Sequence, residues 1–474
     1  MIRVAPIPES LTPLERYALT LLLDGSGLLQ VTDPAAPVVE LSFAPGHDTA
    51  PGDWLVPEDG RVTIAPSMLS AIGRIAGAVA EQETTAADRH DRVPSSVNAQ
   101  VAAGRAAEPT IDILAADLRN AAVHAAGNRP FAVLSPWPDG STWAAALTHD
   151  VDVIAWWPLF TALRMAELGR RGKLGALGTV AVQALAHVPS APALDGVRLV
   201  CEQERRLGIR STWFFLTGTP SLGRILAGDV TYRIEDRPAQ EAIRLALAAG
   251  GEIGLHGSFE TGGDPGAFAT ERVRLQRASG QAVNGVRQHF LRMRPGSTQE
   301  RMEAAGFSYD ATWGFADING FRLGLAVPAP AWSAASSRVH ALELVPLTWM
   351  DRVQSKYQGN EVPASWIAQA LELADTCREA GGLWCGLWHP NLTAPLGYPG
   401  APEAYASLCQ QLVQRAPWFC TLSEAVSWRQ RRRAVRAVRV HEDGRVTLSA
   451  DRADGLALRD AANRAVPFQL QAAA

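Results

Sequence analysis

Two aspartates that stand two residues apart close an apolar run in the segment AAALTHDVD, at positions 150 and 152. Because side chains alternate along an extended chain, Asp150 and Asp152 are expected to face the same side. Such a pair can divide two tasks, one carboxylate holding a metal ion while the other accepts a proton. The pair alone is weak evidence, since aspartates at a strand end also cap helices or form surface ion pairs.

Further groups able to catalyse follow other apolar runs. They are His256, Arg287, His289 and His389. Imidazole and carboxylate groups bind zinc, and water on such an ion becomes a usable nucleophile near neutral pH. Each of these residues also has a structural interpretation, because a strand-end histidine often lies in a core and an arginine often lies at the surface.

The elements that must position these groups are eight strand-like runs separated by helix-length segments. The runs are AAALTHD from Ala144, STWFFLTG from Ser211, EIGLHGS from Glu252, AVNGVRQH from Ala282, YDATWGF from Tyr309, LELVPLTWM from Leu342, LWCGLWH from Leu383 and FCTLSEA from Phe419. In the segment RPAQEAIRLALAAGG, Pro238 can open a helix and Gly250 can end one. This alternation predicts an α/β fold, a distorted (β/α) barrel of seven or eight parallel strands over residues 136–430. The carboxyl ends of barrel strands share one face, so the groups above are expected in one site.

Both flanks of the predicted barrel have a different pattern. Residues 1–135 alternate apolar runs with turns and then a polar stretch, which indicates a small N-terminal α/β domain. Residues 431–474 contain VRVHEDGRVTLSA, which predicts a hairpin turning at Asp443 and Gly444 and hence a short C-terminal β appendage. The arginine-rich run over 429–439 is interpreted as a solvated helix end, a domain joint or a contact for phosphates.

Composition narrows the partners and the compartment. The chain of 474 residues is 47% hydrophobic and 19% charged with a net charge of -4, which describes a globular protein and gives no reason to expect nucleic acid as a partner. Five cysteines without a CxxC pair indicate buried free thiols. The N-terminal segment lacks the basic stretch and uninterrupted apolar core of a secretory signal, so we expect a cytoplasmic protein. No transmembrane segment is expected, because the apolar stretch 174–188 is too short and predicts an amphipathic surface helix.

Four of these segments resemble the motifs of the polysaccharide deacetylases, the family 4 carbohydrate esterases. THDVD at 148–152 resembles the first motif, and LHGSFE at 255–260 resembles the second, in which a histidine precedes Ser or Thr. GVRQHFLR at 285–292 resembles the arginine-bearing third motif, and GLWHP at 386–390 resembles the last. All four come in the order of the family. The segments at 306–324 and 88–94 are similar to those of a bacterial subgroup that carries an extra N-terminal domain.

The resemblance implies a role for each motif residue. Asp150 would be the general base, and Asp152 and His256 would be metal ligands. Arg287 would orient and charge the base through a fork-shaped contact with its carboxylate. His389 would be the general acid that protonates the leaving amine.

The third metal ligand is where the chain departs from the family pattern, because Glu260 occupies the position where the second motif usually has another histidine. Glu260 could replace that histidine, since carboxylates bind zinc, but we favour His289, which ends the adjacent predicted strand. A missing third ligand is the remaining alternative. Asp310 is expected either to support His389 or Arg287, or to cap a loop. The ligand set favours zinc as the divalent ion, with cobalt, nickel and manganese as alternatives.

Trp313 and Trp388 stand beside the motifs and are expected to bind the sugar, although aromatic side chains fill cores equally well. The predicted reaction is the metal-dependent removal of an N-acetyl group from a glycan or glycan precursor through a tetrahedral intermediate. Two other functions remain open at this point. One is a catalytically silent glycan-binding protein on the same barrel, and the other is a hydrolase of the same fold that acts on a small amide.

Overall fold

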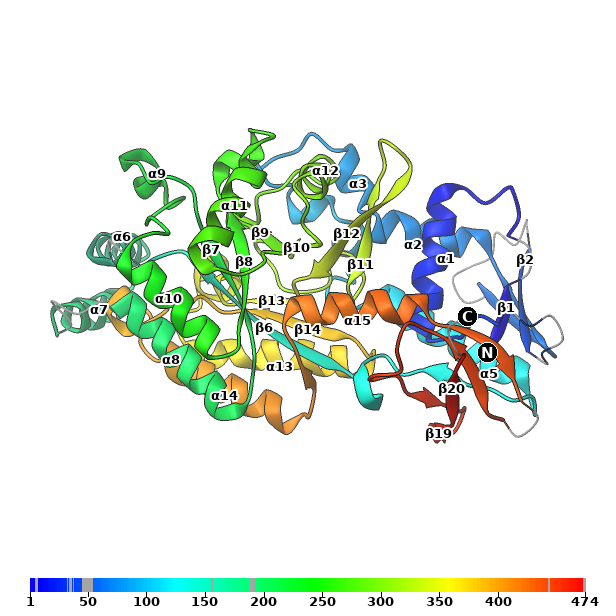
Figure 1. Cartoon of the computed structure of the whole chain (residues 1–474). Helices are drawn as coiled ribbons and strands as arrows, with labels where there is room; N and C mark the ends of the chain where they lie inside the picture. The colour runs from blue at the N-terminus through cyan, green and yellow to red at the C-terminus, as the bar shows by residue number, and fades with distance from the viewer. Residues whose placement is uncertain are drawn as a thin grey trace.

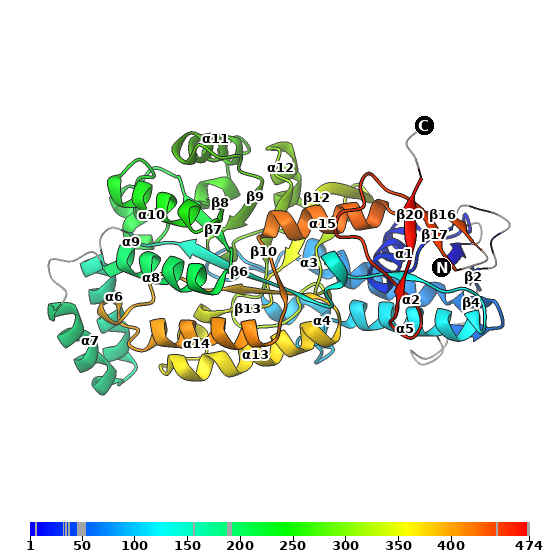
Figure 2. The same ribbon diagram turned by 60° about the horizontal axis from the view of Figure 1, so that its bottom comes forward.

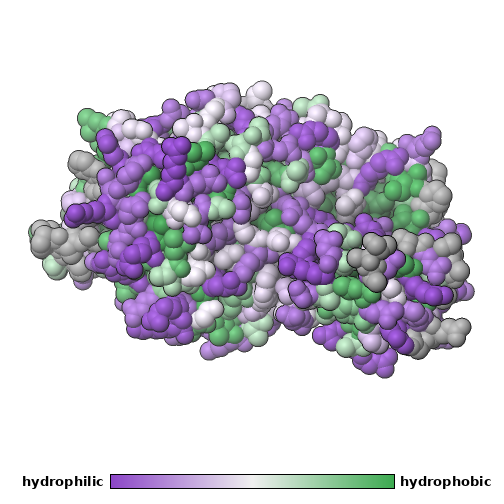
Figure 3. Space-filling view, viewed as in Figure 1, coloured by the Kyte–Doolittle hydropathy of each residue, from purple (hydrophilic) through white to green (hydrophobic). Residues whose placement is uncertain are grey.

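The computed structural model of the protein describes residues 1–4, 7–31, 33, 36, 38–44, 54–154, 157–186, 192–441 and 444–471. These residues form an elongated mixed α/β molecule. The first and last strands, β1 (Ile2–Val4) and β20 (Phe468–Leu470), lie towards one end, and the helices α6 (Trp157–Arg170) and α7 (Leu174–Ala186) lie at the other (Figures 1 and 2). Hydrophilic side chains cover most of the face seen in Figure 3, with hydrophobic side chains scattered among them.

A large, predominantly parallel sheet occupies the centre of the molecule. Its strand order is β11-β12-β10-β9-β8-β7-β6-β14-β13, and β15 pairs with the start of β6. Every neighbouring pair is parallel except β11 with β12. The strands are β6 (Ala144–Val151), β7 (Thr212–Leu216), β8 (Glu252–Gly257), β9 (Gly285–Gln288), β10 (Tyr309–Trp313), β11 (Ala329–Ser333), β12 (Arg338–Pro346), β13 (Trp349–Met350), β14 (Leu383–Leu387) and β15 (Trp418–Phe419). Several of them, β6 among them, are buried along their whole length, as expected for parallel strands covered on both faces.

Seven of the predicted strand-like runs become strands of this sheet, and the eighth does so only at its first residue. After Phe419 that run turns into the helix α15 (Leu422–Ala434). Thr421 caps the helix, because its hydroxyl accepts a hydrogen bond from the Glu424 amide while the Glu424 carboxylate accepts one from the Thr421 amide. The prediction of a strand beyond Phe419 was therefore wrong, and the capping sequence TLSE is the signal that it overlooked.

Helices line the outside of the sheet (Figures 1 and 2). They are α8 (Pro192–Leu207), α9 (Leu222–Ala227), α10 (Arg237–Ala248), α11 (Ala267–Ser279), α12 (Ser297–Ala304), α13 (Pro363–Glu379) and α14 (Ala401–Gln414). The predicted boundaries of α10 are confirmed. Pro238 lies in its first turn, and Gly250 follows its end with a φ of 77°, which a glycine adopts without strain.

A second, four-stranded sheet precedes the central one in the chain, in the order β1-β2-β4-β3. Its elements are β2 (Val39–Phe43), β3 (Leu55–Glu58) and β4 (Arg61–Ile64), accompanied by α1 (Pro13–Ser26), α2 (Pro66–Ala76) and α5 (Thr110–Ala126). After α15 the chain forms β16 (Arg436–Val440) and β17 (Val446–Ser449), an antiparallel pair. Asp443 of the predicted hairpin turn lies outside the described residues. The boundaries 1–135, 136–430 and 431–474 remain predictions, since one apolar core runs from Ile2 through Leu344 to Leu448.

The arginine-rich run turns out to be a joint between helices. Arg429 and Arg432 of α15 are buried, and each donates a 2.6 Å hydrogen bond to the Asp24 carboxylate at the end of α1. These two arginines therefore connect α15 with α1. Their guanidinium groups are enclosed by protein, so they do not form a surface contact for phosphates.

The stretch 174–188 was predicted to be a surface helix, and its residues 174–186 form α7. Residues 187 and 188 lie outside the described part of the chain. Only Val180 of the helix is buried. Unlike an amphipathic helix, α7 exposes leucine and valine side chains on its outer side. Within the described ranges, no helix combines the length and the apolar character that crossing a bilayer requires.

Candidate active site and metal centre

Three side chains from β6 and from the neighbouring strands β8 and β9 meet at the carboxyl end of the central sheet. Asp152 follows β6, His256 lies in β8 and His289 follows β9. Each offers one ligand atom, and these atoms all lie within 4.8 Å of one another. The Asp152 carboxylate is 3.2 Å from Nε2 of His256 and 3.7 Å from Nε2 of His289. The parallel order of the strands thus brings together residues that are more than a hundred positions apart.

His289, rather than Glu260, is the third member of this group. The Glu260 carboxylate points away from it and accepts a 2.8 Å hydrogen bond from Arg224, and its side chain is exposed. The second motif lacks its second histidine, and His289, which follows the adjacent strand β9, stands in that place. This is the alternative that the sequence favoured.

The group fits a divalent metal ion by the chemistry of its donors. One oxygen of the Asp152 carboxylate, Oδ1, is buried and has no hydrogen-bond partner in the described part of the chain. His256 donates from Nδ1 to the Arg287 carbonyl at 2.9 Å, which leaves its Nε2 lone pair free to bind an ion. The other ring nitrogen of His289, Nδ1, lies 3.5 Å from the buried Asp229 carboxylate. Two imidazole nitrogens and one carboxylate oxygen are a set that zinc binds.

The electrostatics of the group favour a charged carboxylate. Burial alone would raise the pKa of Asp152, but His289, His256 and His389 outweigh it and hold that pKa well below its usual range. The pKa of His256 shifts in the opposite direction. Burial would lower the pKa of the imidazole, but Asp150 and Asp152 together raise it above its ordinary value. A cation placed between these groups would take over the charge that a proton on His256 otherwise supplies.

Asp150 faces the same cavity and is held by Arg287. Arg287 Nη1 donates hydrogen bonds to Asp150 Oδ1 at 2.8 Å and to Thr148 Oγ1 at 2.9 Å, and both residues of the ion pair are buried. Burial would raise the pKa of Asp150, but Arg287 and then His256 and His389 keep it below the ordinary value. The contact is not the fork-shaped one expected from the sequence, because a single nitrogen makes it and Arg287 Nε donates instead to the Ala311 carbonyl at 3.0 Å.

His389 is oriented by a carboxylate that the sequence reasoning missed. Asp351 accepts hydrogen bonds from Nδ1 of His389 at 2.7 Å and from its backbone amide at 2.6 Å. This leaves Nε2 of His389 directed at the cluster, 3.5 Å from the Asp152 carboxylate. Burial would lower the pKa of His389, but Asp351, Asp152 and Asp150 raise it. Asp351 directly follows β13, so the strand-end rule that singled out Asp150 would have found it.

Asp310 does not take that supporting role. Its carboxylate accepts hydrogen bonds from Gln299 at 2.8 Å, from the Thr312 amide at 2.9 Å and from Trp313 Nε1 at 2.9 Å. These partners lie on α12 and β10, so Asp310 ties that helix to the sheet and contacts neither His389 nor Arg287.

The two tryptophans expected to bind sugar lie in the core instead. Trp313 and Trp388 are each 2% exposed, and neither lines the cavity at the cluster. Trp388 packs on the rings of Trp349 and Tyr405, at centroid distances of 6.1 and 5.1 Å. Trp313 is the last residue of the buried strand β10 and Trp388 directly follows the buried strand β14, and these positions explain their burial. The expectation that they stack on a sugar is corrected accordingly.

His149, which directly precedes the two aspartates of the first motif, faces the opposite side of β6 from Asp150. Its Nδ1 lies 2.8 Å from the Trp388 carbonyl and its Nε2 lies 2.9 Å from the buried Glu204 carboxylate. The alternation of side chains along a strand therefore separates this structural histidine from Asp150, the catalytic candidate that follows it.

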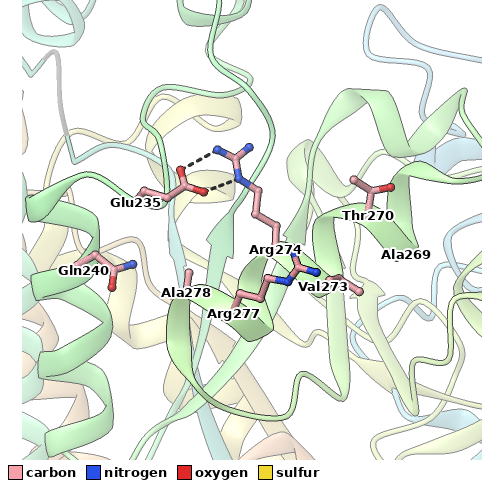
Figure 4. A pocket seen from close by; sticks show the side chains of 8 residues that line it. All are labelled: Glu235, Gln240, Ala269, Thr270, Val273, Arg274, Arg277 and Ala278. Atoms are coloured by element: carbon pink, nitrogen blue, oxygen red, sulfur yellow. Dashed lines mark hydrogen bonds and ion pairs between the residues drawn. The ribbon is translucent and has the colours of Figure 1, made fainter.

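A cavity of about 680 Å³ opens onto the cluster. Five candidates for chemistry stand in its wall, namely Asp150, Asp152, His256, His289 and His389. A separate hollow of about 970 Å³ lies beside α10 and α11 and contains none of them (Figure 4). There Arg274 donates two 2.7 Å hydrogen bonds to Glu235, so these two charges neutralise each other (Figure 4).

Comparison with known proteins gives matches among solved structures alone. No family model and no curated protein matches the chain. A protein from Mycobacterium smegmatis assigned as a polysaccharide deacetylase matches with a TM-score of 0.42 at 23% identity, over 61% of this chain and 91% of that one. An allantoinase matches with a TM-score of 0.42 at 14% identity, over 64% of this chain and 95% of its own. A peptidoglycan deacetylase from Bacillus subtilis matches with a TM-score of 0.30 at 11% identity, over 62% of this chain and 94% of that one. A family 4 pseudoenzyme from Bacillus anthracis matches with a TM-score of 0.30 at 10% identity, over 60% of this chain and 65% of that one. The solved structures that match this chain thus include polysaccharide deacetylases and other family 4 carbohydrate esterases, the family that its four motifs resemble.

Proposed function

We propose that the protein is a metal-dependent hydrolase that removes N-acetyl groups from a sugar or polysaccharide precursor. The proposal rests on one observation: the wall of a single cavity contains the candidate metal ligands, the candidate base and the candidate acid. These are the group of Asp152, His256 and His289, then Asp150, and then His389. Hydrolysis of an amide needs a base, an acid and an electrophile around one carbonyl, and this wall offers candidates for all three.

Asp152, His256 and His289 would hold the ion, for which zinc is the best match to the donors. A divalent ion bound there supplies a Lewis acid and lowers the pKa of water. Asp150, which Arg287 keeps ionised, accepts a proton from the attacking water. His389, protonated and held by Asp351, donates a proton to the leaving amine.

The common site also rests on a proposed closure of the sheet into a seven-stranded barrel. β12 pairs with β10, and β13, which follows it after two residues, pairs with β14. Between them the Leu347 amide donates to the Trp313 carbonyl and the Thr348 amide donates to the Cys385 carbonyl, both at 3.0 Å. One continuous stretch thus contacts both neighbours, which supports a ring of β6, β7, β8, β9, β10, β12 with β13, and β14.

A cytoplasmic glycan precursor is the substrate source that we propose. All five cysteines are free and buried, which is typical of proteins from a reducing compartment. Fractionation of the native host that finds the protein outside the cytoplasm would contradict this part of the proposal.

The test combines metal analysis with product detection. Purified protein is analysed for bound divalent ions and then incubated with N-acetylated oligosaccharides and added zinc, while released acetate is measured. We expect one bound ion per chain and acetate release that a chelator stops. A protein without bound metal and without activity on any acetylated sugar would instead be a silent glycan-binding protein. Cleavage of small amides alone would identify the same-fold hydrolase.

A further inference from the structure

The cavity that holds the cluster has a strongly cationic side. Four of the basic residues in its wall, Arg89, Arg170, Arg352 and Lys356, form no ion pair with a carboxylate among the residues that the structure describes. By contrast, Arg164 on the same wall is neutralised, since it donates a 2.8 Å hydrogen bond to Glu167. The unpaired charges remain available to a ligand.

Two of these cations stand close to the proposed chemistry. Arg352 directly follows Asp351, the carboxylate that orients His389, and its guanidinium donates to the Tyr398 hydroxyl. The Lys356 ammonium lies 5.5 Å from the centre of the Phe290 ring, one residue beyond His289. Both side chains therefore reach the region where the leaving part of a substrate would lie.

The charges repel one another in the absence of an anion. Burial and, after it, the positive charges of Arg352, Arg89 and Arg92 together lower the pKa of Lys356 to about 8. The closeness of these positive charges is unfavourable in the free protein. A ligand with several negatively charged oxygens would reduce the repulsion between them. A phosphate or pyrophosphate suits this arrangement better than a single carboxylate, because it offers more charge and more acceptor oxygens.

The mouth of the same cavity is apolar and continues onto exposed helices. Leu163 of α6 and Leu226 of α9 line the cavity and are exposed. On α7 the side chains of Leu174, Val182 and Leu185 are 72%, 66% and 78% exposed. Helices α6, α7 and α9 together form the end of the molecule farthest from β1 and β20 (Figures 1 and 2), and hydrophobic side chains show at the α9 corner, at the upper left of Figure 3.

Basic residues flank this apolar end. Arg170, Arg171 and Lys173 are exposed at the junction between α6 and α7. A short apolar helix beside a cluster of basic residues is the pattern of helices that lie in the interface of an anionic membrane. A nucleotide carrier would need polar partners for its base and ribose, whereas α7 offers exposed leucine and valine side chains.

We infer that the substrate is an N-acetylated sugar carried on a lipid phosphate, with the phosphate against Arg89, Arg352 and Lys356 and the lipid along the exposed faces of α6, α7 and α9. The inference rests on the proposed function and names the substrate class of that site. The protein then works at a membrane surface without spanning the membrane.

Vesicle binding tests the lipid side of the inference without requiring activity. The full chain is sedimented with vesicles of equimolar phosphatidylcholine and phosphatidylglycerol. The variant Leu174→Gln/Val182→Gln/Leu185→Gln is expected to bind about tenfold more weakly than the natural sequence. The matched control, Leu199→Gln/Val413→Gln, changes exposed apolar residues of α8 and α14 and is expected to bind as the natural sequence does. No vesicle binding by the natural sequence, or equal losses in both variants, would overturn the inference.

Anion binding and substrate preference test the phosphate side. Inorganic phosphate is titrated calorimetrically into the metal-loaded protein, into Arg89→Met/Lys356→Met and into the control Arg277→Met, an exposed arginine of the separate hollow. We expect the double variant to bind phosphate about tenfold more weakly and the control to bind it normally. The ratio kcat/KM is then compared for a polyprenyl-diphosphate-linked N-acetylglucosamine, its nucleoside-diphosphate form and a neutral chitin oligomer, and the lipid-linked form should be preferred.

The outcomes separate this inference from the proposed function. Preference for the nucleotide-linked or neutral sugar, or unchanged phosphate binding in the double variant, would overturn the inference while deacetylation itself stands. Binding to vesicles and phosphate as expected, with no acetate released from any of the three substrates, would overturn the proposed function and support the assigned ligand.

Discussion

Asp150 and Asp152 are two residues apart on one strand edge, yet their surroundings assign them different tasks. Arg287 donates a 2.8 Å hydrogen bond to Asp150, whereas Oδ1 of Asp152 is buried and lies 3.2 Å from Nε2 of His256 and 3.7 Å from Nε2 of His289. We expect Asp150→Asn to lower turnover by about 10²- to 10⁴-fold with its metal content intact. Asp152→Asn and His256→Ala should lose the ion. Elemental analysis beside acetate release measures both effects, and equal metal loss in all three variants would contradict the assigned roles.

Asp351 is predicted to be a positioning residue, because it holds His389 through both its ring nitrogen and its amide. Asp351→Asn should lower kcat by about 10- to 100-fold while KM and metal content stay near their original values. Asp310→Asn is the matched control, since Asp310 is also a buried carboxylate but contacts Gln299, Thr312 and Trp313. A loss of kcat in the control as large as in Asp351→Asn would show that general destabilisation causes both.

The sequence could predict the residues of the site better than their contacts. The strand-end rule assembled Asp150, Asp152, His256, His289 and His389 correctly in one cavity wall. It could not predict that Arg287 uses one nitrogen on Asp150, because that depends on where the Ala311 carbonyl lies. Nor could it predict that Trp313 and Trp388 lie in the core and not in the cavity wall, since each stands at the end of a buried strand.

At the scale of elements, the parallel strands were predictable because they are fully buried and read as continuous apolar runs. Errors arose where a local cap competed with an apolar run. The segment after Phe419 is apolar enough for a strand, but the capping box of Thr421 and Glu424 starts a helix there. The antiparallel edge strand β11 was missed because its sequence, APAWS, contains a proline and a single large apolar residue, Trp332.

The contact between α1 and α15 is the element-scale prediction for stability. Asp24 is the shared acceptor of Arg429 and Arg432, all three are buried, and the two arginines outweigh the effect of burial and lower the pKa of Asp24. Asp24→Ala leaves two buried guanidinium groups without that partner and should lower the free energy of unfolding by about 3–5 kcal/mol. Urea denaturation measures the change.

The control for this variant is Asp59→Ala, which breaks the exposed ion pair with Arg129 and should leave the free energy of unfolding unchanged. If Asp24→Ala denatured at the same urea concentration as the natural sequence, the joint between α1 and α15 would contribute nothing to stability.

At the scale of the whole molecule, the N-terminal sheet and the central sheet share one apolar core. The sequence predicted separate units because the turn-rich and polar stretches before residue 135 resemble a linker. The structure instead places α5 against the segment that leads to β11, where the Asp112 carboxylate accepts a 2.6 Å hydrogen bond from the Ala326 amide. Such long-range packing leaves no periodic trace in a single sequence, so the domain boundaries remain predictions.

Asp112 at this contact gives the molecule a stability that depends on pH. Burial raises the pKa of its carboxyl from 3.8 to about 7, so the folded chain holds a proton there that the unfolded chain releases at much lower pH. The group therefore contributes full stability below about pH 4, and that contribution is lost as the pH rises through about 7. We expect the free energy of unfolding of the natural sequence to fall by about 3 kcal/mol between pH 5 and pH 8, relative to Asp112→Asn. The asparagine can still accept the bond from Ala326 but does not titrate. Urea denaturation at both pH values measures this difference. If the free energy of unfolding changed equally with pH in the two proteins, the carboxyl of Asp112 would not be neutral where it joins α5 to the segment before β11.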